Sequence, residues 1–227
     1  MAVSGPEKRQ EPQGTPPRAK EAPSAVARVA DGIVVGIARH WLLLVNLAVA
    51  IYLFLPLTAP LLAKEGYDGP ARVIYSLYSF SCHQLPERSY FLFGEQPLYS
   101  IASLEAAGMP PGGNLFQRRL FTGNLSTGYK TALCQRDIAI YGTVLLTGLL
   151  FGLVRRRLRA PSVKIYLLFL IPIALDGFTQ LFGLRMSNWW LRTITGAIFG
   201  GASVWLAYPY LEEAMNGVLR TELSRRN

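Results

Sequence analysis

The chain has 227 residues, two cysteines and a formal net charge of +9, and 51% of its residues are hydrophobic while 16% are charged. Soluble domains carry about 25% charged residues, so this composition excludes an ordinary soluble domain and indicates a membrane protein whose main partner is the lipid bilayer. The excess positive charge does not indicate nucleic acid as a partner, because the basic residues lie beside apolar stretches, where they set membrane topology.

Residues 1–38 are predicted to form a disordered N-terminal tail. Residues 1–30 mix Pro, Ala, Gly, Glu and Lys without an apolar period, and a segment of this kind cannot bury enough apolar surface to order itself. A short C-terminal tail is predicted at residues 216–227.

Four apolar stretches lie between the tails, at residues 41–63, 138–154, 165–183 and 189–211. A helix needs about 20 mostly apolar residues to cross the hydrocarbon core of a bilayer, so each stretch is predicted to span the membrane. Gly148 with Gly152, and Gly196 with Gly200, permit close contact between helices. The predicted fold class is an all-α integral membrane domain with four transmembrane helices, covering residues 39–215.

The loop between the second and third stretches is strongly basic, with Arg155, Arg156, Arg157 and Arg159. Lys and Arg concentrate in short cytoplasmic loops, so this loop is predicted to be cytoplasmic. An even number of spans then places both termini in the cytoplasm of a multi-pass protein of the cell membrane. It also places residues 64–137 outside the cytoplasm.

The extracytoplasmic loop is predicted to begin with a helix that starts at Asp68 and ends before Leu85-Pro86. This helix is too short to span a bilayer, so we interpret it as a surface or re-entrant helix. Its last turn is expected to bring Cys82, His83 and Gln84 to the membrane boundary. A second helix is expected around residues 99–107.

Asp176 lies inside the third apolar stretch, where a charge is costly and marks a functional site by default. Helical spacing puts Thr179 and Gln180 on the same face as Asp176. One interpretation is a structural contact in which Asp176 bonds to Arg192 or Arg136 across the bundle. The other makes Asp176 a ligand or a proton acceptor.

The unusual polar residues map to a single level, the outer boundary of the membrane. This follows from the topology, because they come from separated parts of the sequence. They are Cys82, His83, Gln84, Cys134, Arg136, Asp137, Asp176, Gln180, Arg185 and Arg192.

Several chemistries are open to these residues. Cys82, His83 and Cys134, completed by Asp137 or Asp176, are donors that suit zinc or copper, and a haem is the other cofactor considered. Gln84, Arg136, Gln180 and Arg192 are then the expected cofactor contacts. Alternatively, the two cysteines form a disulfide that closes the external loop, or one of them is a catalytic thiol with His83 as its base.

Three classes of function follow. The first is a metal- or haem-binding, or redox, protein. The second is a membrane enzyme or transporter that uses Asp176, with Arg136, Arg185 and Arg192 clamping a lipid headgroup or small anion; those arginines are otherwise interfacial anchors. The third is a structural subunit that associates with another membrane protein or with its own copies.

Short blocks of sequence carry a resemblance to a known family. They are Cys82-His83-Gln84, Arg88-Ser89, Phe93-Gly94, Cys134, Arg136-Asp137, Tyr141-Gly142, Asp176-Gly177, Thr179-Gln180, Arg185, Ser187-Asn188, Arg192 and Thr195-Gly196. In these blocks the chain resembles the bacterial and archaeal membrane proteins grouped as domain of unknown function 2085. The resemblance spans about residues 70–205 and implies a membrane protein, without an established activity.

Overall fold

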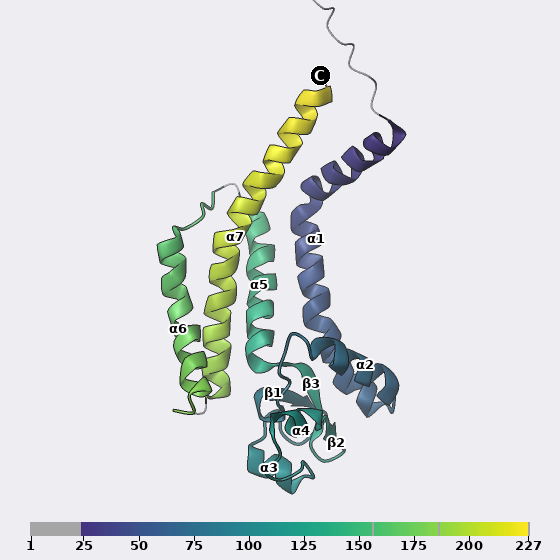
Figure 1. The fold of residues 1–227 in the computed structure, drawn as a ribbon, viewed down its shortest axis with the longest axis vertical. Helices are drawn as coiled ribbons and strands as arrows, with labels where there is room; N and C mark the ends of the chain where they lie inside the picture. The colour runs from purple at the N-terminus through teal and green to yellow at the C-terminus, as the bar shows by residue number, and fades with distance from the viewer. Residues whose placement is uncertain (1–23, 156, 186, 227) are drawn as a thin grey trace, which may run out of the picture.

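The structure is a computed structural model that describes residues 24–155, 157–185 and 187–226. The chain is mostly helical, and a small sheet lies at one end of a bundle of long helices (Figure 1). Its helices are α1 (Ala25–Lys64), α2 (Asp68–Tyr78), α3 (Ile101–Ala106), α4 (Leu115–Leu120), α5 (Gln135–Val154), α6 (Val163–Leu181) and α7 (Trp189–Arg226), and its strands are β1 (Ser89–Leu92), β2 (Gly123–Asn124) and β3 (Gly128–Cys134).

Three of the described helices are long and apolar enough to cross a membrane: Arg28–Lys64 within α1, Gln135–Val154 and Val163–Leu181. The prediction of membrane-spanning helices is therefore confirmed for these three. Helix α7, the fourth predicted span, is not among them. The first turns of α7 contain the charged Arg192, the polar Thr195 and the small Gly196. These residues lower the hydropathy of α7.

Two helices extend beyond the predicted spans. Helix α1 begins at Ala25, so residues 25–38, which the sequence assigns to a disordered tail, are helical here. Helix α7 continues to Arg226 and includes most of the predicted C-terminal tail. Residues 1–23 of the N-terminal tail lie outside the described residues.

Helices α5 and α7 pack through glycine, as the spacing of Gly196 and Gly200 predicts. A Cβ atom on Gly196 would lie 2.9 Å from the carbonyl oxygen of Arg136, and one on Gly200 would overlap the carbonyl oxygen of Ile140. The backbones of the two helices therefore touch, which only glycine permits.

The region between α1 and α5 contains a sheet, which corrects the prediction of a purely helical fold. The antiparallel strands have the order β1-β3-β2, and Ser89 of β1 pairs with Cys134 of β3. Strand β3 ends at Cys134 and α5 begins at the next residue. The sheet is thus joined to a membrane helix without a linker, and we call this end of α5, α6 and α7 the sheet end.

Helix α2 is shorter than the sequence suggests. It ends at Tyr78, where the backbone N–H of Ser81 and that of Cys82 both turn back to the Tyr78 carbonyl oxygen. Cys82, His83 and Gln84 consequently follow the helix in irregular backbone and do not form its last turn. Their approach to the membrane helices depends on the sheet.

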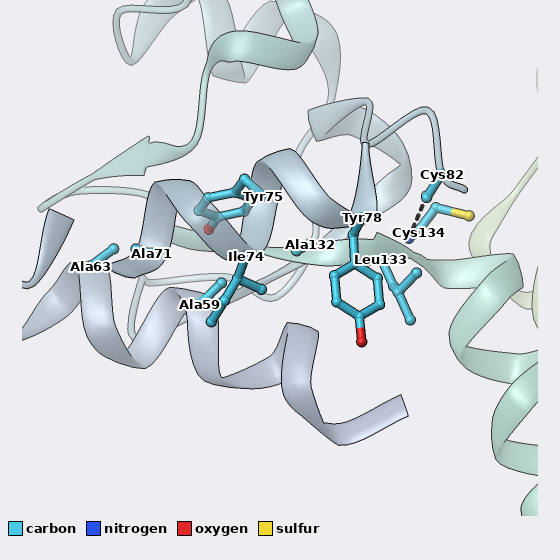
Figure 2. Packing of buried hydrophobic residues seen from close by; sticks show 10 residues of the cluster. All are labelled: Ala59, Ala63, Ala71, Ile74, Tyr75, Tyr78, Cys82, Ala132, Leu133 and Cys134. Carbon is cyan, nitrogen blue, oxygen red and sulfur yellow. Dashed lines mark hydrogen bonds between the residues drawn. The ribbon is translucent and has the colours of Figure 1, made fainter. Parts of the chain in front are cut away.

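A buried cluster between α1, α2 and β3 holds the sheet against α1. Small residues of α1 pack on one face of α2 and on β3, and both cysteines lie at the edge of this cluster (Figure 2). The cluster consists of Ala59, Ala63, Ala71, Ile74, Tyr75, Tyr78, Cys82, Ala132, Leu133 and Cys134. It fixes the position of Cys82 relative to the start of α5.

Candidate functional site

Cys82, Cys134 and Asp137 form a compact group of metal-ligand atoms. The two sulfur atoms and a carboxylate oxygen of Asp137 all lie within 4.8 Å of one another, and both thiols are buried. The backbone N–H of Cys134 donates to the sulfur of Cys82 over 3.2 Å. Residues about fifty positions apart in the chain meet here because β1 pairs with β3.

Both cysteines are free thiols in the structure. Cys134 is the N-cap of α5, and its sulfur accepts the backbone N–H of Asp137 over 3.4 Å. The pKa of Cys134 lies well below its usual value because the Cys82 thiol donates to its sulfur, and His83 and the Asp137 N–H add to the effect. The same hydrogen bond raises the pKa of Cys82. Cys134 is therefore the first thiol to become a thiolate, which is the form that binds metals and acts as a nucleophile.

His83 and Asp176, the other two predicted metal ligands, do not belong to this group of three. The Nδ1 atom of His83 accepts the backbone N–H of Leu85 over 3.1 Å. His83 is nevertheless close enough to Cys134 to contribute to the lowering of the pKa of that thiol.

A cavity of about 150 Å³ lies at the sheet end beside the thiols. The lining residues are Ser81, Cys82, His83, Arg88, Cys134, Arg136, Asp137, Gln180 and Arg192. Seven of these nine residues, all except Ser81 and Arg88, were predicted from the sequence as metal ligands or cofactor contacts. The structure brings these residues together at one cavity. The prediction that they lie at one boundary of the membrane did not require them to be in contact.

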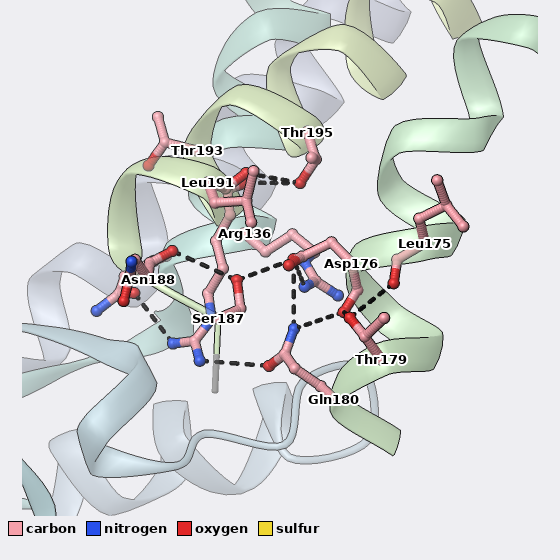
Figure 3. A network of polar contacts seen from close by, with 12 residues as sticks. Arg136, Leu175, Asp176, Thr179, Gln180, Ser187, Asn188, Leu191, Thr193 and Thr195 are labelled. Carbon is pink, nitrogen blue, oxygen red and sulfur yellow. Dashed lines mark hydrogen bonds and ion pairs between the residues drawn. The ribbon is translucent and has the colours of Figure 1, made fainter. Parts of the chain in front are cut away.

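Asp176 lies in a dense polar network instead. It is 1% exposed, and its carboxylate forms ion pairs with Arg136 and Arg185. Ser187 donates to the same carboxylate over 3.0 Å and Gln180 over 3.3 Å (Figure 3). The carboxylate is therefore occupied by protein donors, and this arrangement matches the structural alternative for Asp176, with Arg136 as the partner across the bundle.

Arg192 is held by neutral groups. Its guanidinium donates to the side-chain oxygens of Gln135 and Gln180, each over 3.3 Å, and the residue is 4% exposed. It does not pair with Asp176, the alternative partner considered from the sequence.

Gln84, predicted as a cofactor contact, does not line the cavity beside the thiols. Its amide donates to the carbonyl oxygen of Tyr75 over 2.8 Å, and it lines a separate cavity of about 520 Å³. Its backbone has a positive φ of 52°, an uncommon conformation for a residue other than glycine. Gln84 therefore shapes the segment that carries Cys82 and His83.

Arg88 lines the cavity beside the thiols but was not among the site residues predicted from the sequence. It ends the short 3-10 helix Pro86–Arg88 that leads into β1. Burial lowers the pKa of its guanidinium. The only sequence signal for Arg88 was its place in one of the blocks that resemble the known family.

Lys130 is a fully buried lysine of β3. It is 0% exposed, and its Nζ atom donates to the carbonyl oxygens of Gln84 and Arg119 over 2.8 and 2.5 Å. Burial lowers the pKa of Lys130 to about 7. The hydrogen bond to Gln84 ties β3 to the segment that follows Cys82.

The lowered pKa of Lys130 predicts a pH dependence of stability. Between pH about 7 and about 10.5 the unfolded chain holds a proton at Lys130 that the folded chain has lost, so folding is favoured as pH rises through this window. Below about 7 both states are protonated and the gain is absent. We expect the melting temperature of the wild type to rise relative to that of Lys130→Met between pH ~7 and ~9. Lys164→Met, at an exposed site, is the control, and its melting temperature should depend on pH as that of the wild type does. If the melting temperature of Lys130→Met also rises with pH as steeply as that of the wild type, Lys130 is not the group responsible.

Comparison with known proteins places the chain in a family. The sequence model of DUF2085, described as "Predicted membrane protein (DUF2085)", matches residues 117–206. "Uncharacterized protein MJ1492" of Methanocaldococcus jannaschii is 31% identical over 142 residues, which are 62% of this chain and 69% of that protein. No solved structure matches the chain. The matched region contains Cys134, Asp137, Asp176 and Arg192, and the chain belongs to the DUF2085 family of membrane proteins.

Proposed function

We propose that this membrane protein binds a transition metal ion through Cys82, Cys134 and Asp137. The observation that carries the proposal is the placement of three donor atoms within 4.8 Å of one another. Two thiolates and a carboxylate suit zinc or copper. Three protein ligands leave a coordination position for another molecule, the arrangement of catalytic and exchange sites rather than of closed structural ones.

The electrostatics of the thiols support metal binding. A metal requires deprotonated cysteine, and the lowered pKa of Cys134 favours its thiolate. His83 adds to this lowering of the pKa. The cavity of about 150 Å³ is smaller than the pockets of about 300–1,000 Å³ that hold drug-sized ligands, which favours an ion over a haem.

The position of the site in the membrane forms part of the proposal. Helix α7 runs beside α5 and α6 (Figure 1), so we assign its residues 189–211 as a fourth span. The basic residues Arg155, Arg157 and Arg159 lie at the opposite end from the sheet, between α5 and α6, and they mark that end as cytoplasmic. The metal site then faces the outside of the cell membrane, with both termini in the cytoplasm.

Metal analysis of the purified protein tests the proposal. Protein extracted in detergent from cells supplied with zinc or copper is expected to hold about one ion per chain with both thiols free of a disulfide. Cys82→Ser, Cys134→Ser and Asp137→Asn should each lower the affinity for the metal about tenfold or more. Asp68→Asn, at an exposed carboxylate, is the matched control and should retain the metal. Cobalt loaded in place of zinc should show thiolate-to-metal absorption that is lost in both serine variants.

Two results would overturn the proposal. One is a metal-free protein in which thiol counting finds no free cysteine, because the two sulfurs then form the disulfide that their proximity also allows. The other is bound metal that Cys82→Ser and Cys134→Ser leave unchanged.

A further inference from the structure

The arginines beside the proposed metal site have hydrogen-bonding groups without partners. Among the described residues, the buried Nε atoms of Arg88, Arg136 and Arg192 have no acceptor. All three arginines line the same cavity of about 150 Å³. Unpaired buried donors are rare in native proteins, so protein acceptors do not fully satisfy the guanidinium groups of the three arginines that line this cavity.

The charges around the cavity do not balance. Arg136 shares its one carboxylate partner, Asp176, with Arg185. Arg192 bonds only to neutral amide oxygens. Among the lining residues, Asp137 is the single carboxylate, and it belongs to the group of metal donors. The cavity wall therefore carries an excess of positive charge.

A second cavity continues from the first toward apolar surface. Its volume is about 370 Å³, and it shares Arg88, Arg136 and Gln180 with the smaller one. Its other walls include Leu85, Leu115 and Leu181, and Leu181 is 76% exposed at the end of a membrane helix. An anion held by the arginines thus lies next to a path lined by leucine.

We infer that Arg88, Arg136 and Arg192 bind a phosphate group, either free inorganic phosphate or the headgroup phosphate of a lipid whose chains lie along the leucine-lined cavity. Arginine binds phosphate with several N–H donors at once. The smaller cavity suits a single tetrahedral oxyanion and not a nucleotide. The inference concerns different residues from the proposed metal ligands, and it stands whether or not a metal is bound.

Binding measured in detergent, on protein freed of phosphate and lipid, tests the inference. Inorganic phosphate and short-chain phosphatidic acid are added separately, with sodium chloride at equal ionic strength as the reference. Phosphate or phosphatidic acid is expected to raise the melting temperature of the wild type above the chloride reference. Arg88→Gln should weaken this binding about 10- to 100-fold.

Arg88→Gln is the informative variant because no hydrogen bond of its side chain is lost. Without the anion it should be about as stable as the wild type, since it removes a partly buried charge that has no side-chain hydrogen bond among the described residues. Arg192→Gln should weaken anion binding as well, although it also loses the bonds to Gln135 and Gln180. Arg72→Gln, an external arginine outside this cavity, is the matched control and should bind as the wild type does.

The two sources of phosphate give different outcomes. A shift with phosphatidic acid at much lower concentration than with phosphate, lost in Arg88→Gln, assigns the site to a lipid headgroup. Equal shifts at equal concentration assign it to the free anion. No shift with either compound, or equal shifts in Arg88→Gln and wild type, would overturn the inference. The metal content of Arg88→Gln and the phosphate response of Cys82→Ser separate failure of this inference from failure of metal binding.

Discussion

Asp176→Asn should destabilise the folded protein by about 3 kcal/mol or more, because it leaves buried arginine charge without its carboxylate. Asp176 is 1% exposed, and it is the ion-pair partner of both Arg136 and Arg185. The Arg185 side chain is 44% exposed and can turn toward water, but that of Arg136 is only 22% exposed. Most of the loss therefore comes from Arg136. The measurement is the fraction of detergent-solubilised protein that remains monodisperse after heating.

A double variant distinguishes the ion pair from other effects of the substitution. Asp176→Asn combined with Arg136→Gln removes both charges, so part of the lost stability should return. Asp68→Asn at the exposed start of α2 should behave as the wild type. Because Asp176 lies outside the group of metal donors, the protein that survives should keep its metal. Wild-type stability of Asp176→Asn, or loss of metal from folded protein, would instead favour a role for Asp176 in the site.

Gly200→Ala should separate α7 from α5 and lower stability by about 1–3 kcal/mol. Its new Cβ atom would overlap the carbonyl oxygen of Ile140. That oxygen belongs to a helix backbone and cannot rotate away as a side chain could. The expected result is a lower melting temperature, measured by the same heating assay.

The adjacent glycine provides a matched control for this packing. A Cβ atom on Gly201 would meet the Cγ2 atom of Thr143 at 3.6 Å and that of Thr147 at 3.8 Å, which is ordinary van der Waals contact. Gly201→Ala should therefore leave the melting temperature nearly unchanged. Equal effects of the two alanine substitutions would show that α5 and α7 are not in backbone contact at Gly200.

The membrane helices could be predicted because their signal is local. Helices α5 and α6 begin within a few residues of the stretches predicted at 138–154 and 165–183, since a run of apolar residues is visible in the sequence itself. The sheet left no such signal. Strand β3 carries Lys130 among small and apolar residues and is buried along almost its whole length, so it lacks the alternation that identifies a strand.

The sequence predicted the depth of the site in the membrane but not the contacts between its residues. Topology placed the cysteines and the polar residues of the helices at one boundary, and the structure places most of them around one cavity. The sequence does not show which way each of these side chains points, so it could not tell which of them meet. The pairing of Ser89 with Cys134 brings Cys82 to Asp137, whereas Asp176 faces Arg136, Arg185 and Ser187. Arg88 was visible in the sequence only as part of a block that resembles the family, because its place at the cavity depends on the short 3-10 helix Pro86–Arg88.

The direct passage from β3 into α5 gives the protein a stiff rod. At about 1.5 Å per residue, the 20 residues of α5 extend about 30 Å from Cys134 toward the basic loop at the far end. Cys134 is both the last residue of β3 and the N-cap of α5, so no linker separates the thiol from this rod. A ligand that displaced Cys134 would therefore have to displace the start of α5 with it. Gly196 and Gly200 would carry that displacement to α7, because they hold α7 in contact with the backbone of α5.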